Sequence, residues 1–173
     1  MDNGLMRSVI ETYQQKLDEA ASSAAELVAD IESTFKKHFP NSFINARHSK
    51  GIGNSIMVTI ALAKDKMEAP NKIIDNDPML ANFAIHMNSN QIDDSGEFTG
   101  EPLVIERFRG AGLSWHGQDG FNRIKVPFRK TTGDPAKIIK ALDRHFQRLS
   151  DAVKENAEAL NAKHDFDVTK KVR

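Results

Sequence analysis

The sequence contains no cysteine in its 173 residues. This absence excludes disulfide bonds, thiol nucleophiles and every zinc or iron–sulfur site that needs a cysteine ligand. No apolar stretch approaches the roughly 20 residues that span a bilayer, so no membrane partner is expected. The N-terminus lacks the basic and then apolar pattern of a signal peptide. We therefore expect a cytoplasmic protein.

The chain also lacks a net charge, because 24 basic residues balance 24 acidic ones. A protein that coats nucleic acid non-specifically is usually clearly basic, so the total argues mildly against that role. The balance hides a segregation along the chain. Residues 64–102 hold three basic and eight acidic residues, whereas residues 103–132 hold six basic and two acidic ones. Such asymmetry favours charged surfaces that meet a partner.

The composition is that of a soluble globular protein, with 39% hydrophobic and 28% charged residues. The length suits one domain of ordinary size. We assign residues 1–162 to a single α+β domain with helices at both ends. Residues 163–173 are expected to form a polar, mobile tail.

An a/d heptad seam marks the N-terminal part of the chain. Its positions are Met6, Ile10, Tyr13, Leu17, Ala20, Ala24, Leu27 and Ile31. Asp2 or Asn3 can cap the start of a helix, and Pro40 stops it. The pattern predicts one helix over about residues 4–38, roughly 50 Å long at 1.5 Å per residue.

A second seam marks the C-terminal part, after a helix start at Asp134 and Pro135. Its positions are Ile139, Leu142, Phe146, Leu149, Val153, Asn156 and Leu160. Asn156 allows two interpretations. It is buried and fixes register, or the helix frays there and Ala157 takes the inward place, which we favour. We expect the two helices to pair antiparallel and to build a homo-oligomer.

Between the helices the apolar period changes to two, which is typical of strands. Strands are predicted over residues 55–63, 82–88, 102–108, 112–117 and 123–128, with a weaker one over 42–48 that pairs with 55–63. Residues 64–81 are expected to form a loop. Short turns favour an antiparallel meander. The predicted fold class is α+β, with a long N-terminal helix, an antiparallel sheet of four to six strands and a long C-terminal helix.

Catalytic and metal signatures are missing from the chain. None of the six histidines has the spacing of a zinc ligand set, and no phosphate loop or nucleophile motif occurs. The loop "SWHGQDG" holds His116 and Asp119 among glycines. Those glycines either admit a ligand or form the tight turns of a meander, which we favour. We predict no catalytic residue, no cofactor and no metal ligand.

Acidic residues precede the basic segment and invite comparison with metal-dependent nucleases. They are Asp93, Asp94, Glu97, Glu101 and Glu106. Such enzymes need two or three acids that converge on a cation. The first four lie in a stretch that reads as an exposed hairpin loop, so this interpretation is weak.

The basic segment holds the candidate binding residues, which are Arg107, Arg109, Trp115, Arg123, Lys125, Arg129 and Lys130. Arg123, Lys125 and Arg129 are predicted to share one strand face. Such a row of cations, with Trp115 for stacking, could contact phosphates. It could instead be a solvated face that pairs with the acidic loop 93–101 or with helix carboxylates and protects a sheet edge, which we favour.

The sequence therefore predicts a non-enzymatic accessory or regulatory binding protein. It would be oligomeric through its terminal helices and engage a protein partner through segregated charged surfaces. The alternative is a nucleic-acid-binding protein that uses the basic sheet face of residues 107–130. A third class is a small metal-dependent hydrolase or nuclease that works at the His116/Asp119 loop.

Overall fold

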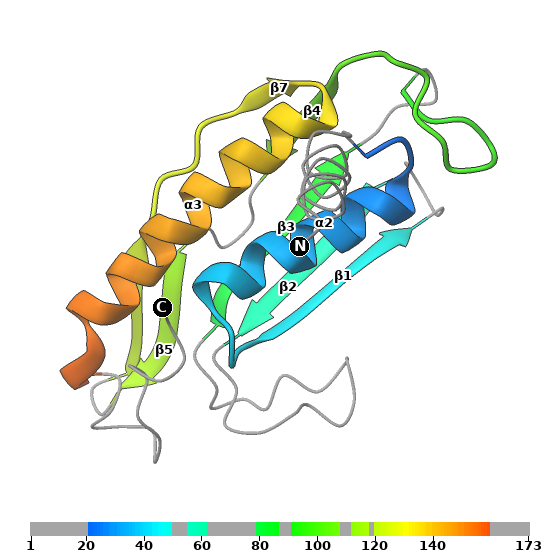
Figure 1. Cartoon of the computed structure of the whole chain (residues 1–173). Helices are drawn as coiled ribbons and strands as arrows, with labels where there is room; N and C mark the ends of the chain where they lie inside the picture. Colours follow the sequence, from blue (N-terminus) through cyan, green and yellow to red (C-terminus); the bar gives the residue numbers. More distant parts are fainter. Residues whose placement is uncertain are drawn as a thin grey trace, which may run out of the picture.

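The computed structural model describes residues 21–49, 55–61, 79–86, 91–107, 112–117 and 120–159 (Figure 1). The helices of this part are α2 (Ala24–His38) and α3 (Pro135–Glu155). The strands are β1 (Phe43–Ser49), β2 (Ser55–Ala61), β3 (Met79–His86), β4 (Leu103–Arg107), β5 (Gly112–Gly117), β6 (Gly120–Lys125) and β7 (Thr131–Gly133). All strand pairs are antiparallel, so the predicted α+β class with an antiparallel sheet is confirmed.

The strands form one sheet of five rows, where a row is one line of the sheet that holds either one strand or two successive strands. β1, β2 and β3 pair in that order. The second edge of β3 pairs with β4 at His86 and with β5 at Met79, so β4 and β5 are two halves of the same row. β7 pairs with β4 and β6 with β5, which makes the fifth row. The sheet has seven strands, more than the predicted four to six, because two rows are interrupted.

One interruption falls in the predicted strand 123–128. β6 ends at Lys125, and pairing resumes only at Thr131 in β7. Pro127 lies in the gap and has no N–H group to donate to a strand ladder. The prediction that Arg123, Lys125 and Arg129 lie on one strand is therefore wrong. A second correction concerns residues 64–81, since β3 already begins at Met79.

The helix that ends at His38 begins at Ala24, so the single helix predicted over residues 4–38 is wrong. Ser23 has extended backbone angles, with φ −140° and ψ 163°, and its side chain accepts a hydrogen bond from the Glu26 amide. Ser23 also forms an isolated β-bridge with Glu97. The extended backbone of Ser23 and its hydrogen bond from the Glu26 amide are the geometry of an N-cap. Residues 4–20 lie outside the described part of the chain.

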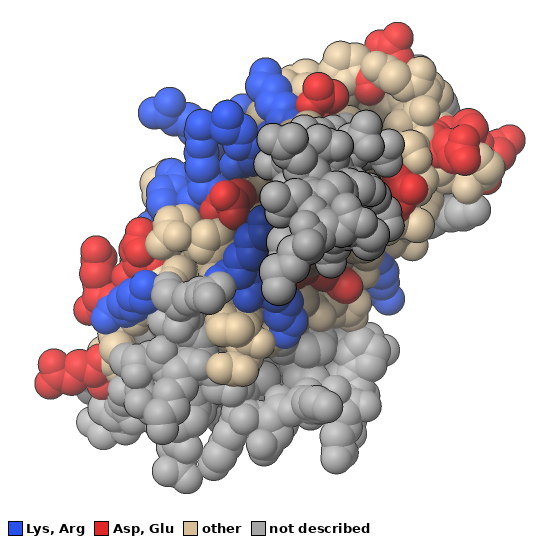
Figure 2. Space-filling view, in the orientation of Figure 1, with Lys and Arg blue, Asp and Glu red and all other residues tan. Residues whose placement is uncertain are grey.

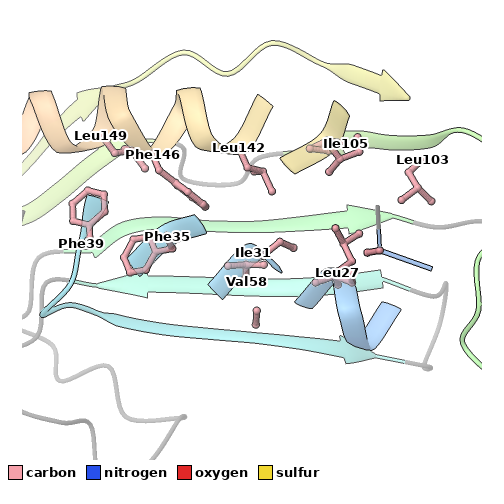
Figure 3. Packing of buried hydrophobic residues seen from close by; sticks show 14 of the residues in the cluster. Leu27, Ile31, Phe35, Phe39, Val58, Leu103, Ile105, Leu142, Phe146 and Leu149 are labelled. Atoms are coloured by element: carbon pink, nitrogen blue, oxygen red, sulfur yellow. The ribbon is translucent and has the colours of Figure 1, made fainter. Parts of the chain in front are cut away.

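The two helices lie side by side over the sheet and run in the same direction (Figures 1 and 3). The predicted antiparallel pair is therefore wrong. The reason is the number of rows between the helices. The chain reverses its direction once after α2 and once after each of the five rows. It therefore makes six reversals before α3 begins. An even number of reversals restores the starting direction.

The core lies where both helices meet the sheet (Figure 3). Its fully buried side chains include Leu27, Ile31, Phe35, Val58, Leu103, Leu142, Phe146 and Leu149. The Phe35 and Phe146 rings pack edge to face, with their centroids 5.4 Å apart. The described parts of both seams are thus buried inside one chain, which leaves their apolar side chains unavailable to a second chain.

Asn156 lies at the C-terminal cap of α3. Its Nδ2 donates a hydrogen bond to the Ala152 carbonyl at 2.8 Å, and Ala157 packs against the core instead. The favoured alternative for this end of the seam is confirmed. The predicted tail over residues 163–173 lies outside the described residues.

Candidate charged binding surfaces

A stripe of four exposed cations runs along the outer side of α3. Lys137, Lys140, Arg144 and Arg148 step by three, four and four residues, which places them on one side of the helix. The opposite side carries the core residues Leu142, Phe146 and Leu149. The stripe extends for roughly 16 Å at 1.5 Å per residue. It ends where Asp151 and Glu155 continue the same side of α3.

Two further exposed cations, Arg129 and Lys130, come from the segment between β6 and β7. This segment is held against α3, because the Phe128 and His145 rings pack edge to face with their centroids 5.1 Å apart. Figure 2 shows Lys and Arg side chains gathered over this part of the molecule. We call these six residues the basic surface: Arg129, Lys130, Lys137, Lys140, Arg144 and Arg148.

His145 lies beneath the basic surface, on the side that faces the core. It is fully buried and lies between Phe128 and the core residue Phe146. Burial, and secondly the nearby charge of Arg148, lower the pKa of His145 from 6.5 to about 4. At neutral pH the imidazole is therefore uncharged and serves as an aromatic packing partner rather than as an acid or base.

The stripe cations of α3 lie toward the end of the helix that the dipole makes unfavourable for them. A helix N-terminus carries partial positive charge and favours acidic residues, while its C-terminus favours basic ones. The four stripe cations occupy the N-terminal two thirds of α3, and Asp151 and Glu155 lie near its C-terminus, whereas the N-cap Asp134 and Lys154 in the last turn suit the dipole. The helix dipole therefore does not account for the position of the stripe.

The acidic residues gather on a separate feature, the acidic hairpin of residues 91–101. Asp93, Asp94, Glu97 and Glu101 are exposed there. An Ile92–Phe98 bridge closes the hairpin, and buried Ile92 ties it to the core. The predicted exposed hairpin loop is confirmed.

The acidic hairpin is fixed to the start of α2 by backbone hydrogen bonds. The Ala24 amide donates to the Gly96 carbonyl, and the Phe98 amide donates to the Ser22 carbonyl, both at 2.9 Å. Gly96 has φ +92°, a conformation that other residues rarely adopt. The hairpin therefore satisfies one of the free amides at the helix N-terminus.

Asp93 has a structural task within the acidic hairpin. Its Oδ1 accepts hydrogen bonds from the Ser95 hydroxyl at 2.6 Å, from the Ser95 amide at 2.9 Å and from the Glu97 amide at 3.0 Å. These bonds, the Ser95 side chain first, lower the pKa of Asp93. Among the described residues, no three His, Asp or Glu side chains come together as metal ligands. The nuclease interpretation gains no support from this part of the chain.

The candidate binding residues of the sequence are scattered rather than gathered on one sheet face. Arg107 ends β4 opposite Ala84, and Arg123 lies in β6 opposite Ser114 of β5. β4 and β6 belong to different rows and do not pair.

The remaining candidates separate further. Trp115 lies in β5 opposite Asn122, and Arg109 lies outside the described residues. Lys125 is exposed at the end of β6, but its neighbours Ile124 and Val126 pack against the core, so it points away from α3. Only Arg129 and Lys130 belong to the basic surface.

The sequence prediction missed the four cations of α3. The signal was the spacing of basic residues in "KIIKALDRHFQR", which repeats at three and four residues within a segment already predicted to be helical. The strand pattern ends near residue 132, so the basic residues before it and the basic spacing of the helix belong to two different local patterns.

The described residues on either side of the His116/Asp119 loop form the antiparallel β5–β6 pair. Gly117 pairs with Gly120, and His116 lies opposite Phe121 in the β5–β6 hairpin. Asp119 lies outside the described residues. For Gly117 and Gly120, which end β5 and begin β6, the favoured interpretation as turn residues of a meander is confirmed.

The basic surface and the acidic hairpin do not pair with each other inside the molecule. No ion pair among the described residues joins the two sets of side chains. The interpretation in which the cations pair with the acidic loop 93–101 of the same chain therefore fails for this surface.

Comparisons with protein families, with characterised proteins and with solved structures found no match. What the protein does must therefore be inferred from its own residues and geometry. Neither helix in the described part of the chain has the length and apolar character needed to cross a bilayer.

Proposed function

We propose that this protein is a non-enzymatic accessory or regulatory binding protein that works through two segregated charged surfaces, the basic surface and the acidic hairpin. The observation that carries the proposal is the charge arrangement on α3. The four stripe cations lie toward the positive end of the helix dipole, and no ion pair among the described residues joins them to an acidic side chain, so they add little to stability. Binding an anionic macromolecule would account for them.

For the basic surface, the phosphate backbone of a nucleic acid is the best-supported ligand. Its α3 stripe is a linear array on a rigid helix, and a duplex presents one negative charge per about 1.7 Å of its axis. Cations that displace counterions from such a polyanion gain affinity without reading sequence. The site proposed here is the outer side of α3 with Arg129 and Lys130, instead of the sheet face of residues 107–130.

Fluorescence anisotropy with labelled single- and double-stranded DNA and RNA tests this ligand. If all six cations contact phosphates of B-DNA, the plot of log K against log salt has a slope of about −5. The double variant Lys140→Gln, Arg144→Gln should reduce that slope by about 2. The matched control Lys37→Gln, Arg47→Gln removes one Lys and one Arg from other exposed positions and should leave the slope unchanged. Absence of binding at low salt would remove nucleic acid as the ligand.

A protein partner with an acidic patch for the basic surface and a basic patch for the acidic hairpin is the second candidate. The acidic hairpin favours it, because carboxylates would repel a nucleic acid but attract basic residues of a protein. Anchored to α2 by two backbone hydrogen bonds, this hairpin presents carboxylates at fixed positions, as a recognition element requires. Charge reversal at Lys140 and Arg144 should then abolish one protein contact and leave the fold intact. Circular dichroism verifies the fold, and a contact that survives the reversal rejects this role of the basic surface.

Oligomerisation through the terminal helices remains a prediction for the N-terminal seam alone. The seam positions from Met6 to Ala20 lie outside the described residues. Light scattering of the wild type and of Leu17→Asp tests it, because a seam between chains would separate into monomers in the variant. A wild type that is already monomeric at all salt concentrations would refute it.

A further inference from the structure

The two charged surfaces of one molecule are complementary to each other. The basic surface has six exposed cations, and the acidic hairpin has four exposed carboxylate residues. Within one molecule they form no ion pair. We infer that the acidic hairpin of one copy docks on the basic surface of a second copy. This inference rests on the proposed anion-binding role of the basic surface and names a protein occupant for it.

The hairpin suits this role because its shape is fixed before binding. Asp93 holds the turn through three hydrogen bonds, and the backbone bonds to Ser22 and Ala24 hold the hairpin on α2. Asp94 and Glu97 can therefore meet cations without ordering a flexible loop, which would cost conformational entropy.

The basic surface suits the hairpin because an anion there compensates the unfavourable position of its cations. Lys137 and Lys140 lie near the positive end of the α3 dipole. Carboxylates of a second copy would interact favourably with these cations and with the helix N-terminus at once. No acidic residue stands within the row Lys137, Lys140, Arg144 and Arg148, and the Oδ1 atom of the neighbouring Asp143 lies 2.8 Å from His38 Nε2.

Docking between two different surfaces has a consequence for the assembly. Each copy that donates a hairpin leaves its own basic surface free, so the contact is heterologous and adds copies head to tail. Ion pairs between exposed groups are weak and screened by salt. We therefore expect association that grows with protein concentration at about 0.01 M ionic strength and disappears at about 1 M, where the Debye length is about 3 Å.

Analytical ultracentrifugation of the full chain tests this inference with two complementary variants. The hairpin variant Asp94→Asn, Glu97→Gln keeps Asp93, which the turn requires. The surface variant Lys140→Gln, Arg144→Gln keeps the hairpin. Each variant alone should associate about tenfold more weakly than the wild type, because only one side of each contact remains fully charged. Lys37→Gln, Arg47→Gln is the control and should associate as the wild type does.

An equal mixture of the two variants gives the decisive result. The surface variant supplies an intact hairpin and the hairpin variant supplies an intact basic surface, so the mixture should form pairs that do not grow further. A wild type that stays at the monomer mass of 19.3 kDa at low salt and high concentration overturns the inference. So does a mixture that stays monomeric while the wild type associates.

The outcome also separates this inference from the proposed ligand of the basic surface. Nucleic-acid binding without self-association rejects the second copy as occupant and keeps the proposed function. Self-association without nucleic-acid binding rejects nucleic acid and keeps the inference. If the surface variant keeps both nucleic-acid binding and self-association, the basic surface has no anion-binding role and both proposals are rejected.

Discussion

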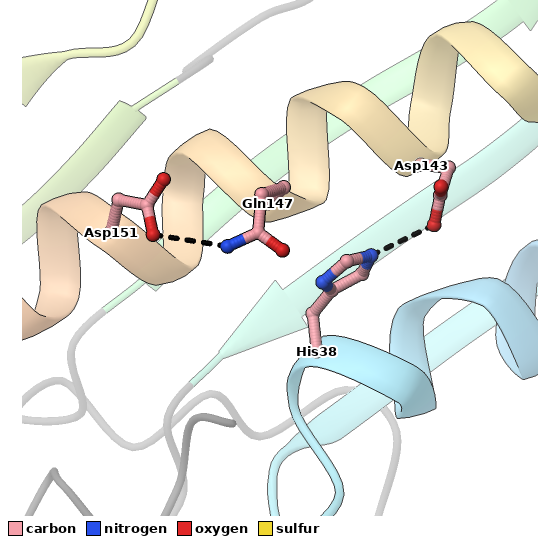
Figure 4. Close-up of polar contacts among 4 residues, drawn as sticks. All are labelled: His38, Asp143, Gln147 and Asp151. Carbon is pink, nitrogen blue, oxygen red and sulfur yellow. Dashed lines mark hydrogen bonds and ion pairs between the residues drawn. The ribbon is translucent and has the colours of Figure 1, made fainter.

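The Nε2 atom of His38 lies 2.8 Å from Oδ1 of Asp143 (Figure 4). The contact joins the last residue of α2 to the middle of α3, across 105 residues of sequence. On the next turns of α3, the Gln147 amide donates to Asp151 at 3.0 Å along the same helix. The His38–Asp143 contact therefore ties the two parallel helices together on their outer side, above the Phe35–Phe146 contact in the core.

A double-mutant cycle measures what this tie contributes. The Asp143 side chain is 47% exposed and that of His38 is 14% exposed, so solvent screens the interaction in part. We expect His38→Gln and Asp143→Asn to show a coupling free energy of about 0.5–1 kcal/mol in urea unfolding. Arg144→Gln with His38→Gln is the control and should be additive. A coupling near zero would mean that the contact is incidental to helix packing.

The N-cap of α2 is the subject of a second prediction. Ser23 accepts a hydrogen bond from the Glu26 amide, while the Glu26 carboxylate accepts from the Ser22 amide at 2.6 Å and from the Ser22 hydroxyl at 2.8 Å. We expect Ser23→Ala to lower the free energy of unfolding by about 1 kcal/mol. Ser33→Ala, an exposed serine inside the helix, should be neutral or slightly stabilising because alanine is the better helix former. Equal effects of the two changes would argue against the cap.

This cap explains why the start of α2 was mispredicted. The heptad pattern continues through Ala20, Ala24 and Leu27 without a break, so periodicity alone extends the helix backward. The residues Ser23 and Glu26 form a Ser-x-x-Glu signature that marks a helix start. Local capping and the Ser23–Glu97 bridge outweigh the periodic pattern here, and the bridge depends on a residue 74 positions away.

Most strands and α3 were predictable because their signals are local, whereas β7 was not predicted. Asp134 and Pro135 mark the start of α3, and the alternating pattern of residues 112–117 matches β5. The break in the last row was harder, because Pro127 indicated a strand end without saying where pairing would resume. The direction of α2 relative to α3 required the number of rows, which no single segment encodes.

The charged character of the candidate site was predictable from the sequence, but most of the residues that form it were not. Charge segregation is visible in the sequence, and Arg129 and Lys130 were identified correctly as exposed cations. The other members of the basic surface lie on α3, and they meet this segment only because Phe128 packs on His145. That tertiary contact is invisible in the local pattern of either segment.

A third prediction concerns the seam on α3. Leu149 is fully buried inside the described fold. Leu149→Asp should therefore unfold the protein rather than separate an oligomer, because it buries an unpaired charge. Phe146→Ala should lower the free energy of unfolding by about 3–5 kcal/mol. A folded, monomeric Leu149→Asp variant by circular dichroism and light scattering would place the seam between chains.

The fourth prediction is a pH dependence that comes from His145. Its native pKa of about 4 is below the ordinary value of 6.5, so the unfolded chain binds the proton first as pH falls. The stability that neutral His145 contributes is complete above about pH 6.5 and is lost progressively down to about pH 4, by about 3 kcal/mol in all. Urea unfolding of the wild type and of His145→Leu at pH 7 and 4.5 measures it, because shifts at Asp93 and Glu26 are common to both and cancel. The wild type should lose more stability than the variant between these pH values; parallel losses would show that His145 takes up a proton as easily in the native state as in the unfolded chain.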